Sequence, residues 1–148
     1  MSLLQEIQSK CSAEMIASHD YGAIAAAVNV GRTKVQRCSI GKGTIADVLG
    51  IPAGPMFIYA VKGAASQPMP DNPTPEQYAE KVMLDLAWNL IDTANFDVGL
   101  PSTRAGLDLF VGKIPGFSQA AADAIKAVAE VADPVTAHDI ENVLNEVI

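Results

Sequence analysis

The sequence is poor in cysteine and in basic residues, and each shortage excludes a class of protein. Its two cysteines, Cys11 and Cys38, are too few for the disulfide framework of a small secreted domain. Basic residues number 10 against 17 acidic ones, which gives a formal net charge of −7 at pH 7. A chain this acidic is poorly suited to coat nucleic acid or an anionic membrane nonspecifically.

A long apolar run is also missing. The longest one, residues 51–61, is interrupted by Pro52, Gly54 and Pro55 and falls short of the roughly 20 apolar residues that a membrane-spanning helix needs. Since the N-terminus carries no signal-peptide pattern either, the sequence predicts a protein made and kept in the cytosol, with no membrane partner. The run itself is expected to lie in the core or at an interface.

Motifs that dictate a chemistry are missing as well. Residues 40–44, IGKGT, resemble part of a phosphate loop, but that loop needs Ser or Thr directly after its lysine, and here Gly43 follows Lys42. The two cysteines, His19 and His138 lack the close spacing of zinc ligands. We therefore predict no catalytic residue, no cofactor and no metal, and expect a non-enzymatic protein.

What the sequence does contain is helical periodicity with matched capping residues. With 148 residues, of which 49% are hydrophobic, the chain is long enough for one compact domain with a buried core. Apolar residues recur at helical spacing after residues that can cap a helix N-terminus, namely Ser2, Asp20, Thr44, Thr74, Ser102, Ser118 and Thr136.

The predicted fold is mainly α, a compact bundle of seven or eight short helices with at most one or two short strands around residues 33–40. It forms a single domain over residues 1–148, with a proline-rich surface loop at residues 64–74. The first helix is expected to continue to about Ser18, and the alanine-rich one from Ser118 to the break at Asp133 and Pro134. The helix after Thr74 is the strongest, and a broad apolar face is expected on it, made by Tyr78, Val82, Leu86 and Leu90 with Met83 and Ile91.

Four of the ten basic residues gather in one stretch, residues 20–50, which has two interpretations. In the first it is a DNA-binding helix-turn-helix, whose second helix begins at Arg32 or Thr33 and presents Arg32, Lys34, Gln36 and Arg37 to phosphates and base edges. In the second, residues 30–40 are extended, because Thr33 and Val35 are β-branched and the alternation fits a strand almost as well.

Four segments together carry a resemblance that covers nearly the whole chain: IASHDYGAIAAAVNVGRTKVQ, IGKGTIADVLG, FDVGLPSTRAGLDLFV and FSQAAADAIKAVAEVADPVTAHDIENVL. The order resembles a family of small uncharacterised proteins encoded by tailed bacteriophages and prophages. The resemblance implies a phage origin and a virion-associated or assembly role, in the host cytoplasm during assembly and then in the virion. It offers no catalytic residues, and the loop at residues 67–75 departs from the family pattern.

The leading functional prediction is a phage structural or assembly protein that associates with itself or with other phage structural proteins. Its basic stretch would face the acidic residues 114–148 of another copy, while apolar surface around residues 51–59 or the alanine-rich helices supplies most of the energy. The alternatives are a helix-turn-helix DNA-binding regulator using residues 20–40, and a phage inhibitor of a host defence protein. The candidate partner-binding residues are Arg32, Lys34, Arg37, Lys42, Met56, Phe57 and Tyr59.

Overall fold

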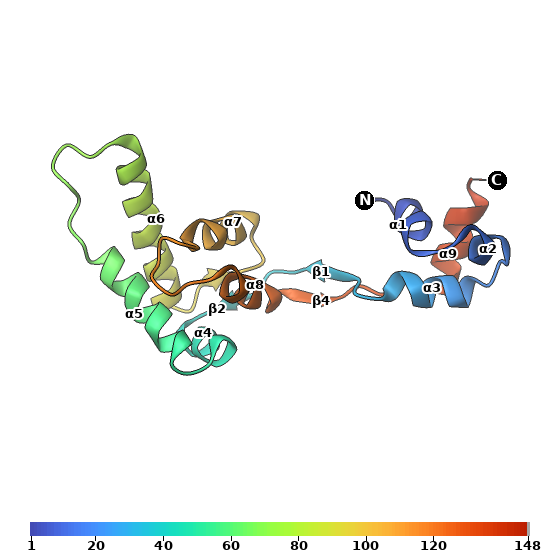
Figure 1. Cartoon of the computed structure of the whole chain (residues 1–148), viewed down its shortest axis with the longest axis horizontal. Helices are drawn as coiled ribbons and strands as arrows, with labels where there is room; N and C mark the ends of the chain where they lie inside the picture. The colour runs from blue at the N-terminus through green and yellow to red at the C-terminus, as the bar shows by residue number, and fades with distance from the viewer. Residues whose placement is uncertain (148) are drawn as a thin grey trace. The chain divides into compact units, whose positions relative to one another are not determined.

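The computed structural model describes residues 1–147 (Figure 1) and confirms the mainly α fold, since the chain is 61% helical with only 7% in strands. The described residues form nine helices and four short strands, more than the sequence predicts of either. In chain order they are α1 (Leu3–Lys10), α2 (Ala13–Ala17), α3 (Tyr21–Asn29), β1 (Thr33–Val35), β2 (Ser39–Ile40), α4 (Lys42–Leu49), α5 (Ala53–Ala65), α6 (Pro75–Asp92), β3 (Phe96–Asp97), α7 (Pro101–Phe110), α8 (Gln119–Ala127), β4 (Glu130–Ala132) and α9 (Ala137–Asn145).

Two of the predicted helices end early. The first is divided into α1 and α2, because Cys11 is extended (φ −118°, ψ 142°) and the Ser12 hydroxyl caps α2 by accepting from the Met15 N–H. The alanine-rich helix ends at Ala127, and Glu130–Ala132 forms β4. A side-chain cap in the first place, and pairing of β4 with the distant β1 in the second, override a continuous helical pattern.

Five of the seven predicted caps are confirmed. The side chains of Ser2, Asp20, Thr74, Ser118 and Thr136 each accept a hydrogen bond from a backbone N–H in the first turn of a helix. Thr44 and Ser102 were wrong as caps. α4 begins two residues before Thr44, after Gly41, and α7 begins with Pro101 after Leu100, so both predicted caps lie inside helices.

The chain divides into two compact units. Unit 1 contains Met1–Lys34 and the chain from Val131 onward, and unit 2 is Val35–Glu130. The strands form two-stranded pairs, β1 with β4 and β2 with β3, and in the antiparallel second pair Ser39 lies opposite Asp97 and Ile40 opposite Phe96. The sequence predicts a single domain over residues 1–148. Whether the two units unfold together as one domain stays a prediction.

Unit 1 has its own hydrophobic cluster. α1, α3 and α9 pack together around side chains that are almost fully buried, namely Ile7, Cys11, Ile24, Ala25, Val28, Ile140 and Leu144. Segments more than a hundred positions apart in the sequence thereby build one core, since α9 completes what α1 and α3 begin.

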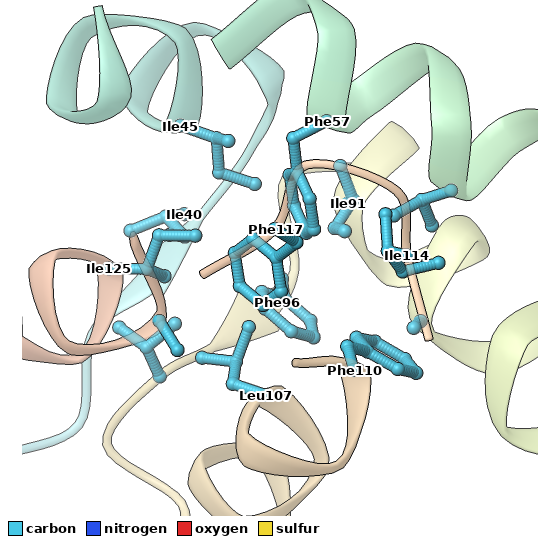
Figure 2. Close-up of a cluster of buried hydrophobic side chains, with 14 of the residues drawn as sticks. Ile40, Ile45, Phe57, Ile91, Phe96, Leu107, Phe110, Ile114, Phe117 and Ile125 are labelled. Carbon is cyan, nitrogen blue, oxygen red and sulfur yellow. The ribbon is translucent and has the colours of Figure 1, made fainter. Parts of the chain in front are cut away.

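Unit 2 has a separate cluster, which Figure 2 shows from within. Phe57 of α5 and Phe117 stack at its centre, with ring centroids 4.4 Å apart and ring planes inclined by 27°. Isoleucine, leucine and phenylalanine side chains from α4, α6, α7 and α8 point toward this pair. Residues 66–74 connect α5 to α6 without regular structure and are mostly exposed.

Candidate functional site

The basic stretch contains strands and no recognition helix. Thr33–Val35 forms β1 and Ser39–Ile40 forms β2, so the helix expected from Arg32 or Thr33 in the DNA-binding alternative is wrong. The stretch is also shared between the units, because Arg32 and Lys34 belong to unit 1 and Arg37 and Lys42 to unit 2.

Arg32 and Lys34 are engaged inside unit 1. The Arg32 guanidinium lies 2.6 Å from a Glu6 carboxylate oxygen and 3.2 Å from one of Asp133, and its Nε donates to the Asp133 carbonyl at 2.8 Å. The hydrogen bond with Glu6 is the main cause that raises the pKa of Arg32. Lys34 reaches Asp133 at 3.8 Å. The sequence predicts that the basic stretch pairs with acidic residues of another copy. Arg32 instead pairs with Asp133 of its own chain.

Arg37 and Lys42 are engaged inside unit 2. Arg37 pairs with Asp97, which also accepts from the Cys38 N–H at 2.9 Å and the Gly99 N–H at 3.0 Å. Asp97 is the single buried charged side chain within residues 1–147. Its bond with Arg37, followed by the Cys38 amide, lowers its pKa. Lys42 lies 2.6 Å from Asp92.

The three candidate partner-binding residues on α5 differ in how far they are buried. Met56 and Tyr59 are exposed, at 62% and 79%, whereas Phe57 is 4% exposed and belongs to the core of unit 2. On a helix, residues three apart point to the same side, and the residue directly after the first of them points elsewhere. Met56 and Tyr59 can therefore contact a partner, and Phe57 cannot while unit 2 is folded.

An open groove in unit 2 brings two of the candidate residues together. It has a volume of about 630 Å³ and lies between α4, α5 and α6, with mainly apolar side chains in its lining. Its chemistry-bearing residues are Lys42, Tyr59, Lys62, Trp88 and Asp92. Three of these, Lys62, Trp88 and Asp92, were not among the predicted site residues, and no spacing in the sequence links them to Lys42.

A second surface lies on the exposed side of α6. Tyr78, Val82 and Leu86 are exposed at 57%, 46% and 57%, whereas the buried residues of the helix are Leu84, Ala87 and Ile91. Of the apolar face predicted for this helix, Ile91 is buried and Met83 and Leu90 are half-buried, but Tyr78, Val82 and Leu86 were wrongly expected to share that face. Apolar residues run along both sides of α6, and hydrophobicity alone does not distinguish which side faces the core.

Of these exposed residues, Leu86 also lines a smaller groove between α6 and α7. This groove has a volume of about 210 Å³. It is lined mainly by Met83, Leu86, Leu90, Phe96 and Phe110. Leu109 of α7, 53% exposed, adds apolar surface on the neighbouring helix.

Residues 1–147 contain no helix long and apolar enough to cross a bilayer, and in the same residues no three His, Cys, Asp or Glu side chains come together as metal ligands. Comparison with protein-family models, curated proteins and solved structures finds no match. The resemblance to phage proteins and the alternative of a host-defence inhibitor stay predictions.

Proposed function

We propose that the chain is a non-enzymatic structural or assembly protein of a phage particle, which associates with itself through the exposed side of α6 in the host cytoplasm and then in the virion. One observation carries the self-association. The most exposed side of α6 bears no charge over its whole length, and consists of Pro75, Tyr78, Ala79, Val82, Leu86 and Asn89.

A solvent-facing side of this kind is unusual for a helix that already has a buried face. Surface helices carry charged and polar residues opposite their apolar stripe, and a helix apolar on both sides is normally covered on both. The charged residues of α6, such as Asp85 and Asp92, lie beside the uncharged side rather than on it. The pattern is that of an interface centre with a polar rim.

A second copy of the chain fits this surface by geometry. Tyr78, Val82 and Leu86 are spaced four residues apart and form one ridge along α6. Two such ridges pack into each other's grooves at a crossing angle of about 50° in the commonest class of helix packing. Because the same ridge serves both copies, the contact closes as a two-fold dimer.

Light scattering after size exclusion, at tens of micromolar protein, tests the proposal. We expect the unmodified chain to be at least a dimer. Leu86→Glu should be a monomer, because dimerisation would have to bury the unpaired glutamate charge in the interface. Val30→Glu is the control, since Val30 is 73% exposed and belongs to unit 1. A monomeric unmodified chain contradicts self-association.

A further variant separates the two candidate contact surfaces. Tyr59→Glu changes the surface around residues 51–59, which the sequence predicts as an interface alongside the alanine-rich helices, and leaves α6 intact. We expect Tyr59→Glu to remain associated. Dissociation by Tyr59→Glu but not by Leu86→Glu would move the interface to α5 and overturn the assignment to α6.

A further inference from the structure

The groove between α4, α5 and α6 combines an apolar floor with charged edges. Ala46, Pro55, Ile58 and Trp88 supply most of its apolar lining, and its volume of about 630 Å³ is that of a site for several side chains rather than for one ion. A neighbouring hollow of about 530 Å³ shares Gly43, Ala46 and Pro55 with it and continues along Asp47 and Ile51. The lining therefore suits an elongated occupant.

Two lysines flank the only tryptophan of the chain. The Nζ atoms of Lys42 and Lys62 lie 5.8 and 5.9 Å from the Trp88 ring centroid, within the range of cation–π attraction. Lys42 is paired with Asp92, whereas Lys62 has no ion pair within residues 1–147. Two lysines and one aspartate leave the groove one net positive charge, on a chain whose formal net charge is −7.

We propose that this groove docks a short acidic peptide segment of a partner protein. A carboxylate of the segment pairs with Lys62 beside Lys42, and a large apolar side chain next to it packs on Trp88 and Ile58. The single uncompensated charge matches one carboxylate. A nucleic acid strand would bring a phosphate at every nucleotide, and Asp92 and Asp47 would repel it. The proposal goes beyond self-association and does not depend on it.

Trp88 makes binding directly measurable, because tryptophan emission from the full chain reports on this groove alone. The probe is a short capped peptide with one glutamate among leucines and no other charge, and calorimetry provides a second readout. We expect a saturable change in emission that weakens as salt is added. The matched peptide of glutamine and leucine should bind more weakly. Equal binding of the two peptides would overturn the proposal, because charge would then play no part.

Two further ligands distinguish other occupants. An oligothymidylate of the same length tests a nucleic acid groove, and inorganic phosphate tests a simple anion site at the lysines. We expect neither to produce the saturable change that the acidic peptide produces. Saturation by oligothymidylate without binding of the peptide, or the same saturation with phosphate alone, would overturn the docking of a peptide.

Gly43 allows the groove to be filled without disturbing the fold. A side chain at Gly43, the second residue of α4, would meet no other atom within 4 Å, so Gly43→Leu projects into open space and should abolish saturable binding. The matched control is Gly22→Leu, at the second position of α3 in unit 1, where the nearest atom to an added Cβ is at 3.5 Å. Unchanged binding by Gly43→Leu would contradict the site.

Lys62→Gln tests the charge separately from the space. We expect Lys62→Gln to weaken binding of the acidic peptide about two- to fivefold, which is the effect of losing an exposed ion pair. Binding of the glutamine peptide should not change. Lys34→Gln is the control, since Lys34 is an exposed lysine of unit 1. Equal effects of the two lysine substitutions would mean that the peptide responds to net charge and not to the groove.

Discussion

The side-chain amide of Asn29 pairs with the backbone of Val135 in both directions. Its Nδ2 donates to the Val135 carbonyl at 2.9 Å, and its Oδ1 accepts from the Val135 N–H at 2.8 Å. Asn29 is the last residue of α3, and Val135 precedes α9. The amide thus imitates a rung of a β-ladder and joins segments 106 positions apart to complete unit 1.

We expect Asn29→Asp to destabilise unit 1 by about 1–3 kcal/mol, because a carboxylate oxygen would replace the donor and face the Val135 carbonyl. Urea unfolding followed by circular dichroism measures the change. The control is Asn142→Asp on the exposed surface of α9, which makes no side-chain hydrogen bond within residues 1–147. If the two variants unfold at the same urea concentration, the Asn29–Val135 pair contributes nothing to stability.

Asp97 should make the stability of unit 2 depend on pH. Its pKa is lowered from the ordinary 3.8, first by Arg37 and then by the Cys38 amide. A group with a lowered folded-state pKa stabilises the fold above its unfolded pKa, and this contribution is lost as the pH falls through the folded value. The loss therefore begins near pH 4 and continues below it.

We expect Asp97→Asn to be less stable than the unmodified chain at pH 7, with the difference shrinking as the pH falls below about 4 and the Asp97 carboxylate takes up a proton. The asparagine oxygen can still accept from Cys38 and Gly99, so the substitution chiefly removes the charge. Asp71→Asn in the exposed loop is the control. A difference that does not vary between these pH values would contradict the role of the ionised carboxylate.

Two threonines of different local structure offer a test of helix capping. Thr74 caps α6 by accepting from the Gln77 N–H, and the Gln77 side chain accepts from the Thr74 N–H in return. We expect Thr74→Ala to cost about 1 kcal/mol of unfolding free energy. Thr44 lies inside α4 and caps nothing, so Thr44→Ala should change stability by no more than about 0.5 kcal/mol. Equal losses in thermal or urea unfolding would contradict this difference.

The same two threonines show how far the sequence leads. Helix capping and apolar periodicity are local, so Thr74 and the mainly α fold could be predicted from neighbouring residues. Thr44 could not be excluded, because α4 begins earlier, at Lys42 behind Gly41. Glycine is favoured at the N-cap position about as strongly as threonine, so a helix can begin after Gly41 without a side-chain cap.

Pairing between segments far apart in the chain could not be predicted from the sequence. β4 interrupts an alanine-rich helical pattern because it pairs with β1, which lies about a hundred residues earlier in the chain. The groove around Trp88 requires α4, α5 and α6 to meet, and only Lys42 and Tyr59 of its residues were predicted for a site. On α6 the apolar residues were recognised, but the side that faces the core depends on packing with α5 and β3.

Two glycines of α5 should respond to alanine in opposite ways. A Cβ on Gly54 would lie 2.5 Å from the Ala46 Cα, in the backbone of α4, whereas one on Gly63 would meet nothing within 4 Å. We expect Gly54→Ala to destabilise unit 2 by about 1–3 kcal/mol despite its better helix propensity. Gly63→Ala should stabilise it by about 0.5–1 kcal/mol. Equal stabilisation by both would mean that α4 and α5 do not approach this closely.

The two hydrophobic clusters share no residue, and this gives a test of how the chain unfolds. Ile24 is fully buried in the cluster of unit 1, so Ile24→Ala should cost about 2–5 kcal/mol there by lost burial and a residual cavity. Trp88 packs against the cluster of unit 2, and its emission follows that unit alone.

Because each unit buries its own core, we expect Ile24→Ala to lower the midpoint of part of the circular dichroism transition and to leave the midpoint of Trp88 emission unchanged. Leu107→Ala in the cluster of unit 2 is the converse variant and should move the Trp88 transition. Coincident transitions that shift together in both variants would instead indicate one cooperative unit. That result would support the single domain predicted from the sequence over residues 1–148.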